Sequence, residues 1–310
     1  MKSFLSILLF LSSVFLFAQV QDETDLSKGL VKGKEIKPSI ELYKVYTLDK
    51  DTTFVDTSMT LKNEYKYNYL RKDIFGLIPF ANEGHTYNIL NFGLTSKNVS
   101  PNFGYTAKHF NYLEVNDIKY YSVPTPFTEL YYKTVMEQGQ SLDAFLALNT
   151  KPNLNFSIAY KGLRSIGKYI NNISSSGNFR FTTSYFTKDK RYFLNAHFTA
   201  QDISNQENGG ITDVSLFELS EPPYDERDRL EVYFRDATSL LKGHRFFIDH
   251  YYKLNKNNSN NLVIFHQFNH EYKFFEFTQP TLSDRFGDAF SARINNKTRY
   301  NHLYNKVGTA

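Results

Sequence analysis

The stretch NFRFTTSYFTKDKRYFLNAHFTA, residues 178 to 200, has the pattern of two strands joined by a tight turn. Apolar and polar residues alternate on both sides of the turn, with the two-residue period of a β-strand. A two-residue turn at 189–190 would place Phe181 opposite Phe198 and Thr182 opposite His197. The apolar residues are odd-numbered before the turn and even-numbered after it, as cross-strand pairing requires. We therefore predict a hairpin with one apolar and one polar face.

The same alternation occurs in three stretches that precede this hairpin. Apolar residues take every second position in these three sets: Leu130, Tyr132 and Met136; Leu142, Ala144, Leu146 and Leu148; Leu154, Phe156, Ile158 and Tyr160. The positions between them are largely polar, as at Lys133, Ser157 and Lys161. This pattern is typical of strands that have one apolar and one hydrated face.

The composition supports an all-β chain and excludes several classes of site. The 310 residues include 23 Tyr and 29 Phe but no Trp and no Cys. Aromatic residues suit half-buried pleated surfaces. Without Cys there can be no disulfide framework, no thiolate zinc ligand and no thiol nucleophile. The formal charge of +4 is small for this length and does not indicate nucleic-acid binding.

The N-terminus has the features of a secretory signal. Lys2 precedes an apolar run from Phe4 to Phe17, which is too short for a membrane helix, and Ala18 is a suitable cleavage point. No Cys follows, so a lipoprotein anchor is not expected. We assign residues 1–18 to a signal peptide and 19–120 to a lead-in with short strands, either periplasmic or the start of a barrel. Residues 121–310, which contain the alternating stretches, are assigned to an outer-membrane β-barrel.

The connections between the expected strands differ in length at the two ends. Those at 150–153, 188–191 and 238–243 are short, whereas those at 163–176, 203–226 and 255–261 are longer and polar; 138–140 is a short connection at the long end. Outer-membrane barrels have short periplasmic turns and longer extracellular loops. The predicted fold is therefore an antiparallel transmembrane up-and-down β-barrel, whose residues 128–310 have room for about eight to twelve strands.

Three local motifs are better explained without special chemistry. Gly162, Gly167 and Lys168 have phosphate-loop spacing, but no helical pattern follows, so we expect a strand that ends at Gly162 and then a polar loop. His266 and His270 are four apart, about 13 Å along a strand, which is too far for one metal, and we expect them to face the lumen.

The third motif is the acidic run EPPYDERDRLE, residues 221–231. It could bind a divalent cation or bridge to lipopolysaccharide, but a solvated loop is the preferred interpretation. No G-x-S-x-G or local Ser/His motif is present, and we predict no enzyme activity and no catalytic, cofactor-binding or metal-binding residues.

Three blocks of the sequence are distinctive: RKDIFGLIPFANEGHTYNILNFG (71–93), PTPFTELYYKT (124–134) and GQSLDAFLALNTKPNLNFSIAYKGLRSIGKY (139–169). These blocks resemble the putative porin family of Bacteroidetes-type bacteria. The resemblance extends to about residue 300. It implies an outer-membrane barrel in a Gram-negative cell but names no site residues. It also implies a final strand with a terminal aromatic, whereas this chain ends in YNKVGTA, so we expect part of the barrel to be missing.

The resemblance and the strand pattern together predict a porin that passes small hydrophilic solutes by diffusion. Its expected partners are outer-membrane lipids, lipopolysaccharide and the barrel assembly machinery. Parity makes Lys133, Lys161, Arg180 and Asp249 candidates for lumen charges, and Phe186, Tyr192 and Phe193 candidates for the interfacial girdle. A diffusion pore needs about sixteen strands, so the alternative is a surface-binding or adhesin-type β protein without channel activity, either in the outer membrane or secreted.

Overall fold

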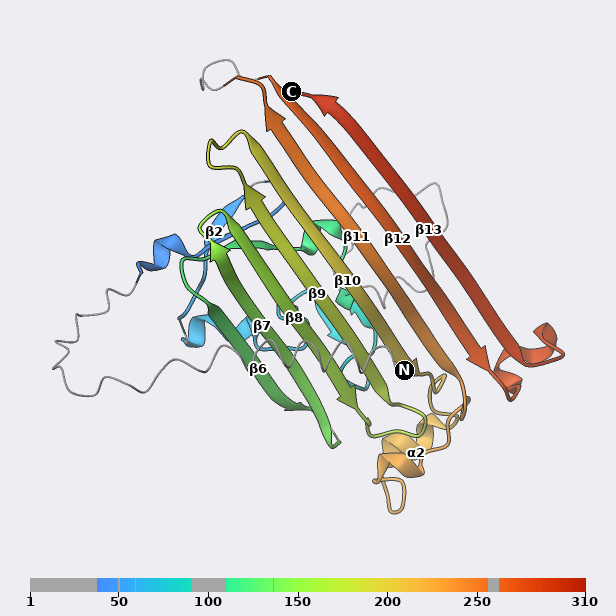
Figure 1. Ribbon diagram of the computed structural model, residues 1–310. Coiled ribbons are helices and arrows are strands. Elements are labelled where there is room, and N and C mark those ends of the chain that lie inside the picture. The colour runs from blue at the N-terminus through green and yellow to red at the C-terminus, as the bar shows by residue number, and fades with distance from the viewer. Residues whose placement is uncertain (1–37, 50, 59, 91–109, 136, 256–261) are drawn as a thin grey trace, which may run out of the picture. The chain divides into compact units, whose positions relative to one another are not determined.

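The central feature of the computed structural model is an eight-stranded antiparallel sheet (Figure 1). The structure describes residues 38–49, 51–58, 60–90, 110–135, 137–255 and 262–310, so the expected signal peptide lies outside it. Each strand pairs with its neighbours in sequence. The strands are β6 (Phe127–Val135), β7 (Gly139–Lys151), β8 (Leu154–Ser165), β9 (Ser174–Phe186), β10 (Tyr192–Gln206), β11 (Thr238–Lys253), β12 (Val263–Gln279) and β13 (Ile294–Thr309).

The predicted antiparallel, up-and-down, all-β topology is confirmed. Among the described residues, β6 and β13 do not pair with each other, so the sheet is open and no closed barrel is observed. The strand lengths run from 9 residues in β6 to 17 in β12, and about 9–11 tilted residues are enough to cross a bilayer. The predicted register of the central hairpin is also confirmed, because Phe181 lies opposite Phe198 and Thr182 opposite His197.

The connections alternate between two ends of the sheet, as predicted, but two of the predicted connections are in the wrong place. At one end, which we name the long-connection end, lie 166–173, 207–237 and 280–293, together with the tight β6–β7 turn. At the other lie 152–153, 187–191 and 254–262. The connection predicted at 238–243 is wrong, because β11 runs through it. The connection near 255–261, of which 256–261 lie outside the described residues, therefore joins strands at the opposite end from the one predicted.

Two glycines explain why strand ends were misplaced. Gly243 resembles a turn residue, but it lies inside β11, where a Cβ atom would be 2.3 Å from the Tyr112 hydroxyl oxygen. Glycine is needed there for close approach of another segment and not for a turn. Gly162 does not end β8 either, since that strand continues to Ser165. No helix follows Gly167 and Lys168, so the phosphate-loop spacing is incidental.

The two faces of the sheet are inverted relative to those of a water-soluble protein. On β8 the polar residues are covered, with Ser157 3% and Lys161 6% exposed, whereas Ile158 is 44% and Tyr160 48% exposed. We name the covered side, which carries Ser157 and Lys161, the inner face, and the side that carries Ile158 and Tyr160 the outer face. Cross-strand pairs place Thr182 and His197 on the inner face and Phe181 and Phe198 on the outer face.

The expected positions of the two histidines and of the aromatic girdle require correction. His266 and His270 pair across the sheet with His250 and the exposed Phe246, so they lie on the outer face and not toward the lumen. Apolar residues occupy both faces of β12, including the buried Phe275 and Phe277, and parity alone therefore misleads on this strand. The Nε2 atom of His250 lies 2.8 Å from Nδ1 of His266.

Of the three proposed girdle residues, only Tyr192 is on the outer face. Phe186 and Phe193 are on the inner face, where their rings stack with centroids 6.1 Å apart, and Phe193 also stacks on Tyr251. Adjacent residues of a strand point to opposite sides, so Tyr192 and Phe193 could not both face outward. The outer aromatic neighbours of Tyr192 are Tyr185 and His250.

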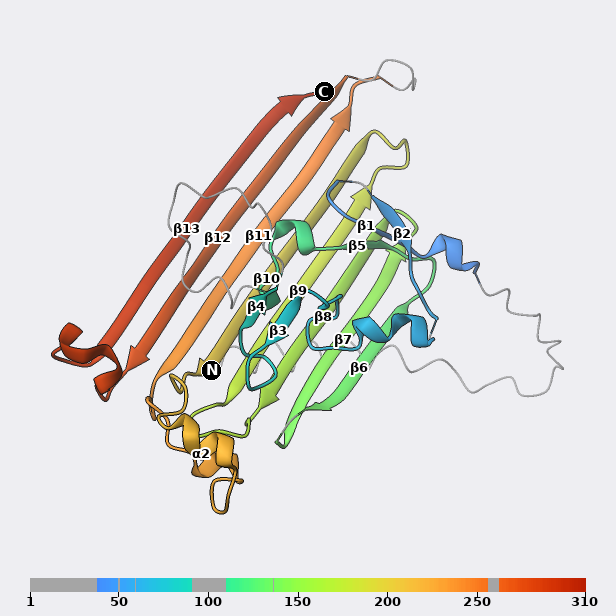
Figure 2. The same cartoon turned by 180° about the vertical axis from the view of Figure 1, so that it is seen from behind.

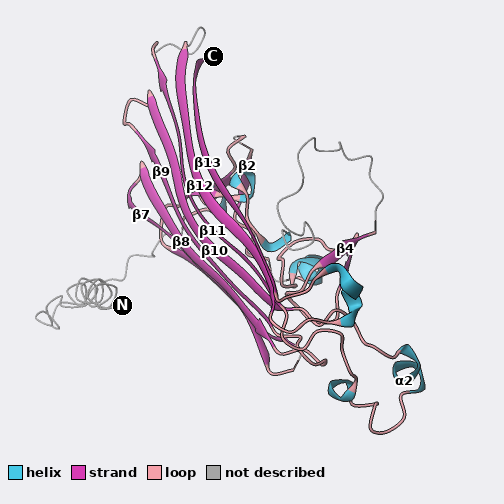
Figure 3. Cartoon of the chain, turned by 90° about the vertical axis from the view of Figure 1, so that its right-hand side faces the viewer, coloured by secondary structure: helices cyan, strands magenta, loops and turns pink. Residues whose placement is uncertain are grey.

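The N-terminal part of the described chain covers the inner face (Figures 2 and 3). We name residues 38–49, 51–58, 60–90 and 110–123 the inner segment. It contains a three-stranded sheet, a two-stranded sheet and short 3-10 helices: β1 (Lys44–Tyr46), β2 (Thr52–Phe54) and β5 (Tyr120–Ser122); β3 (Leu77–Pro79) and β4 (Tyr87–Ile89); and Ile40–Leu42, Leu61–Lys66 and Val115–Asp117.

Two apolar clusters anchor the inner side near the long-connection end. One joins Tyr112 to Ile203, Leu241 and Phe275, and the other joins Tyr69 and Leu70 to Leu163. The 207–237 connection, with α2 (Val214–Leu219) and the 3-10 helix Arg227–Arg229, contributes Phe234 to the first cluster. A last 3-10 helix, Asp284–Ala289, precedes β13. No helix in the described part of the chain is both long and apolar enough to cross a membrane.

A pair of cysteine variants tests the covering of the inner face, because the natural chain has no Cys. Ala144 and Ala147 lie on opposite faces of β7, and Ala147 is fully buried. We expect N-ethylmaleimide to modify Ala144→Cys several times faster than Ala147→Cys in detergent-solubilised protein, since the inner thiol reacts only through local opening. Both thiols should react equally in urea. Equal rates in the folded protein would contradict the assignment of the two faces.

Candidate functional site

The inner segment is held on the sheet by tyrosine hydroxyl groups that reach polar residues of the inner face. The Tyr69 hydroxyl lies 2.6 Å from Oγ of Ser176, and the Tyr120 hydroxyl lies 2.8 Å from Nδ1 of His197. A tyrosine can bury its ring while its hydroxyl satisfies a polar partner. Burial raises the pKa of both hydroxyl groups above the ordinary value, so they stay protonated at neutral pH.

An ion network around a buried arginine also attaches the inner segment to the sheet. Arg245 of β11, whose side chain is fully buried, donates to the Leu113 carbonyl at 3.0 Å and to carboxylate oxygens of Glu114 and Glu271 at 2.8 Å each. Tyr112 donates to the same Glu271 oxygen at 2.9 Å, and the Lys273 ammonium lies 3.2 Å from Glu114. Two cations thus face two carboxylates. A charge withdrawn from water requires such partners, or its burial is costly.

Side-chain amides complete the attachment by pairing with the backbone of the inner segment. Gln201 of β10 accepts from the Leu113 amide at 2.8 Å and donates to the Leu113 carbonyl at 3.0 Å. Asn155 of β8 accepts from the Val123 amide at 2.9 Å. These contacts satisfy backbone groups that no strand pairing would reach. The polar inner face is therefore a docking surface for the inner segment.

All four of the charged residues proposed by parity lie on the inner face, but their surroundings differ. Lys161 is buried, donates to Oδ1 of Asn111 at 2.7 Å and lies over the Tyr69 ring. Arg180 pairs with Asp143 at 3.1 Å. Lys133 lies 3.9 Å from a carboxylate oxygen of Glu83. Asp249 pairs across the sheet with Asn195, which places it on the same side. The alternation in the sequence therefore predicted that these four residues share one face of the sheet, but it did not predict which residues they contact.

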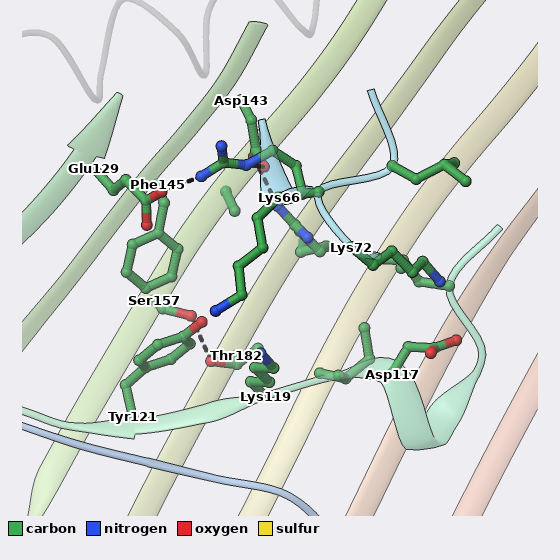
Figure 4. Close-up of a pocket in the computed structure, with 16 residues that line it drawn as sticks. Lys66, Lys72, Asp117, Lys119, Tyr121, Glu129, Asp143, Phe145, Ser157 and Thr182 are labelled. Atoms are coloured by element: carbon green, nitrogen blue, oxygen red, sulfur yellow. Dashed lines mark hydrogen bonds and ion pairs between the residues drawn. The ribbon is translucent and has the colours of Figure 1, made fainter. Parts of the chain in front are cut away.

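A cavity of about 360 Å³ lies between the inner segment and strands β6 to β9 (Figure 4). Five cationic and three acidic side chains line it: Lys66, Arg71, Lys72, Lys119 and Arg180, with Asp117, Glu129 and Asp143. Arg71 pairs with Glu129 and also approaches Asp143, so both sheet carboxylates are already matched by guanidinium groups. The cavity is therefore cationic in its remaining charge.

The rest of the cavity wall is apolar or carries hydroxyl groups. Tyr121 and Phe145 contact each other with ring centroids 4.5 Å apart, and Ser157 and Thr182 are joined by a hydrogen bond of 2.6 Å. Burial raises the pKa of the Tyr121 hydroxyl to about 12, so this group remains neutral and can donate. The combination of cations, hydroxyl groups and rings suits a small polar molecule with a carbon body.

Sequence reasoning missed the inner-segment half of this site. Lys66, Lys72 and Lys119 come from short irregular elements without periodicity, and nothing in their local sequence indicates that they face the sheet. The acidic run at 221–231 lies in the 207–237 connection, as predicted for a solvated loop, and Arg229 pairs there with Glu226. Within the described residues no group of three or more His, Asp or Glu side chains is placed to hold a metal ion.

Comparison with known proteins identifies a family. A family model described as "Putative porin" matches residues 39–310, which includes the inner segment as well as all eight long strands. No curated protein and no solved structure matches the chain.

The buried network predicts unequal effects for two similar substitutions on β12. Glu271→Gln removes a charge beside the fully buried Arg245, and we expect a loss of about 3 kcal/mol in the free energy of unfolding. The matched change Glu276→Gln breaks a partly exposed pair with Lys297 and should cost about 0.5 kcal/mol. Urea unfolding of detergent-refolded protein, followed by circular dichroism, measures both. Similar losses would show that Glu271 is not part of a buried network.

Proposed function

Because the chain belongs to the putative porin family, we propose that it is an outer-membrane protein through which small hydrophilic solutes diffuse. The proposed process is passive and includes no catalytic step and no cofactor. Outer-membrane lipids and lipopolysaccharide would surround the outer face of the sheet.

The observation that carries this proposal is the inversion of the two faces. A strand that crosses hydrocarbon must turn apolar side chains toward lipid, and its backbone groups must all be paired with neighbouring strands. The exposed side chains of Ile158, Tyr160, Phe198 and Phe246 meet the first requirement. The strands from β7 to β12 meet the second, because each pairs with a neighbour on both sides, whereas β6 and β13 at the edges of the sheet pair on one side only. A water-soluble sheet would bury these side chains instead.

The inner segment affects how wide the proposed path for solutes can be. It covers much of the polar inner face, so water and solutes have less room than in an unobstructed barrel. We therefore propose a narrow path that passes the charged cavity and gives a small conductance. Rings of charged residues set ion preference in such constrictions.

A second candidate function is surface binding without transport. The 207–237 connection favours it, because it is the longest connection of the sheet and exposes apolar residues such as Val214 and Leu219 beside its charged run. A barrel whose interior is filled would leave such loops as its working surface.

Planar-bilayer recording on the full-length protein separates the two candidates. We expect discrete current steps of small amplitude in potassium chloride, with a linear dependence on voltage. Membrane insertion is verified in parallel by flotation with lipid vesicles. Insertion without any current steps would remove the transport proposal and favour surface binding.

A further inference from the structure

We propose that the cavity between the inner segment and strands β6 to β9 binds small organic anions that carry carboxylate or phosphate groups. This inference rests on the proposed function and names the class of solute that the path would favour. It depends on three features of the cavity: its unmatched cations, its mixed wall and its size.

The unmatched cations are all on the inner segment. The guanidinium groups of Arg71 and Arg180 are engaged by the carboxylates of the sheet. In contrast, Lys66, Lys72 and Lys119 form no ion pair with any described residue, although all three line the cavity. The neighbouring Asp117 accepts a hydrogen bond from the Glu114 amide at 2.9 Å and keeps its negative charge. The Lys66 ammonium also lies 5.2 Å from the centroid of the Tyr65 ring. Three ammonium groups therefore face one carboxylate that forms no ion pair with a described residue, and the surplus of positive charge favours an anionic ligand.

The guanidinium groups strengthen this preference for anions. The side chains of Arg71 and Arg180 are only about one fifth exposed, and each retains a nitrogen without a hydrogen-bond partner, Nη1 in Arg71 and Nε in Arg180. Charges act over longer distances where water is partly excluded. Arginine also matches the planar geometry of carboxylate and phosphate groups. An anion in the cavity would therefore meet cations from both walls.

The size and the wall indicate an organic anion in preference to a bare inorganic ion. About 360 Å³ lies at the lower end of the range for small-molecule sites. Rings of Tyr121 and Phe145 and the side chains of Leu70 and Ile118 offer contact to a carbon skeleton, while the Ser157 and Thr182 hydroxyl groups offer hydrogen bonds. Citrate has the required size and charge and serves as the probe.

Isothermal titration calorimetry on the full-length protein in non-ionic detergent tests the inference without reference to transport. We expect citrate to bind at low ionic strength and glucose, a neutral molecule of similar size, to give no heat. The double variant Lys72→Gln, Lys119→Gln removes two exposed cavity ammonium groups and should weaken citrate binding about tenfold. Lys188→Gln, an exposed lysine in the turn of the β9–β10 hairpin, is the matched control and should bind like the parent.

The outcomes separate this inference from the proposed function. Citrate binding that is about tenfold weaker in the double variant and unchanged in Lys188→Gln supports the anion site, even if no current is found in bilayers. Citrate heat no greater than glucose heat, or equal binding by the parent and the double variant, overturns the anion site and leaves passive transport standing. Both substituted lysines are exposed, so the double variant should fold like the parent. Circular dichroism and urea unfolding of each variant check that a loss of binding does not come from a loss of structure.

Discussion

Each long strand of this protein has to satisfy two environments at once, and the pleat allows this because neighbouring side chains point to opposite sides. The outer face can be apolar because backbone hydrogen bonds to both neighbours pair the strands that lie between β6 and β13. The inner face can be polar because the inner segment supplies hydrogen bonds and ion pairs to it as well as apolar contacts. The inverted distribution of side chains on β8, with Lys161 covered and Ile158 exposed, follows from this division.

The inner segment provides the cover, and its chemistry explains part of the unusual composition. Tyrosine brings a ring and a hydroxyl group to the same place, so Tyr69, Tyr112 and Tyr120 can pack on the sheet and still satisfy Ser176, Glu271 and His197. The ion network around Arg245 attaches the inner segment to the sheet in one position, since a shift that removed one partner would leave a buried charge unpaired. Where this matching of charges is incomplete, beside Lys72 and Lys119, a cationic cavity remains.

The sequence predicted the elements that depend on local alternation and failed on those that depend on distant contacts. The pairing of Phe181 with Phe198 and the side on which Lys161 lies both follow from a two-residue period and a tight turn. The role of Gly243 could not be predicted, because it depends on Tyr112, which is far away in the chain. The docking of the inner segment depends on single polar contacts between distant residues, and such contacts leave no periodic signal. His266 was misplaced because both faces of β12 carry aromatic residues.

The most direct test of the account is whether the outer face touches lipid. The natural chain contains no Trp, so Phe246→Trp and Phe247→Trp each introduce a single reporter at adjacent residues of β11, one 44% and the other 4% exposed. In vesicles that contain brominated lipids, fluorescence of the outer Trp at 246 should be strongly quenched and that of the inner Trp at 247 hardly changed. Equal quenching at both positions, or no quenching at 246 in a protein that remains dissolved in buffer, would contradict the account.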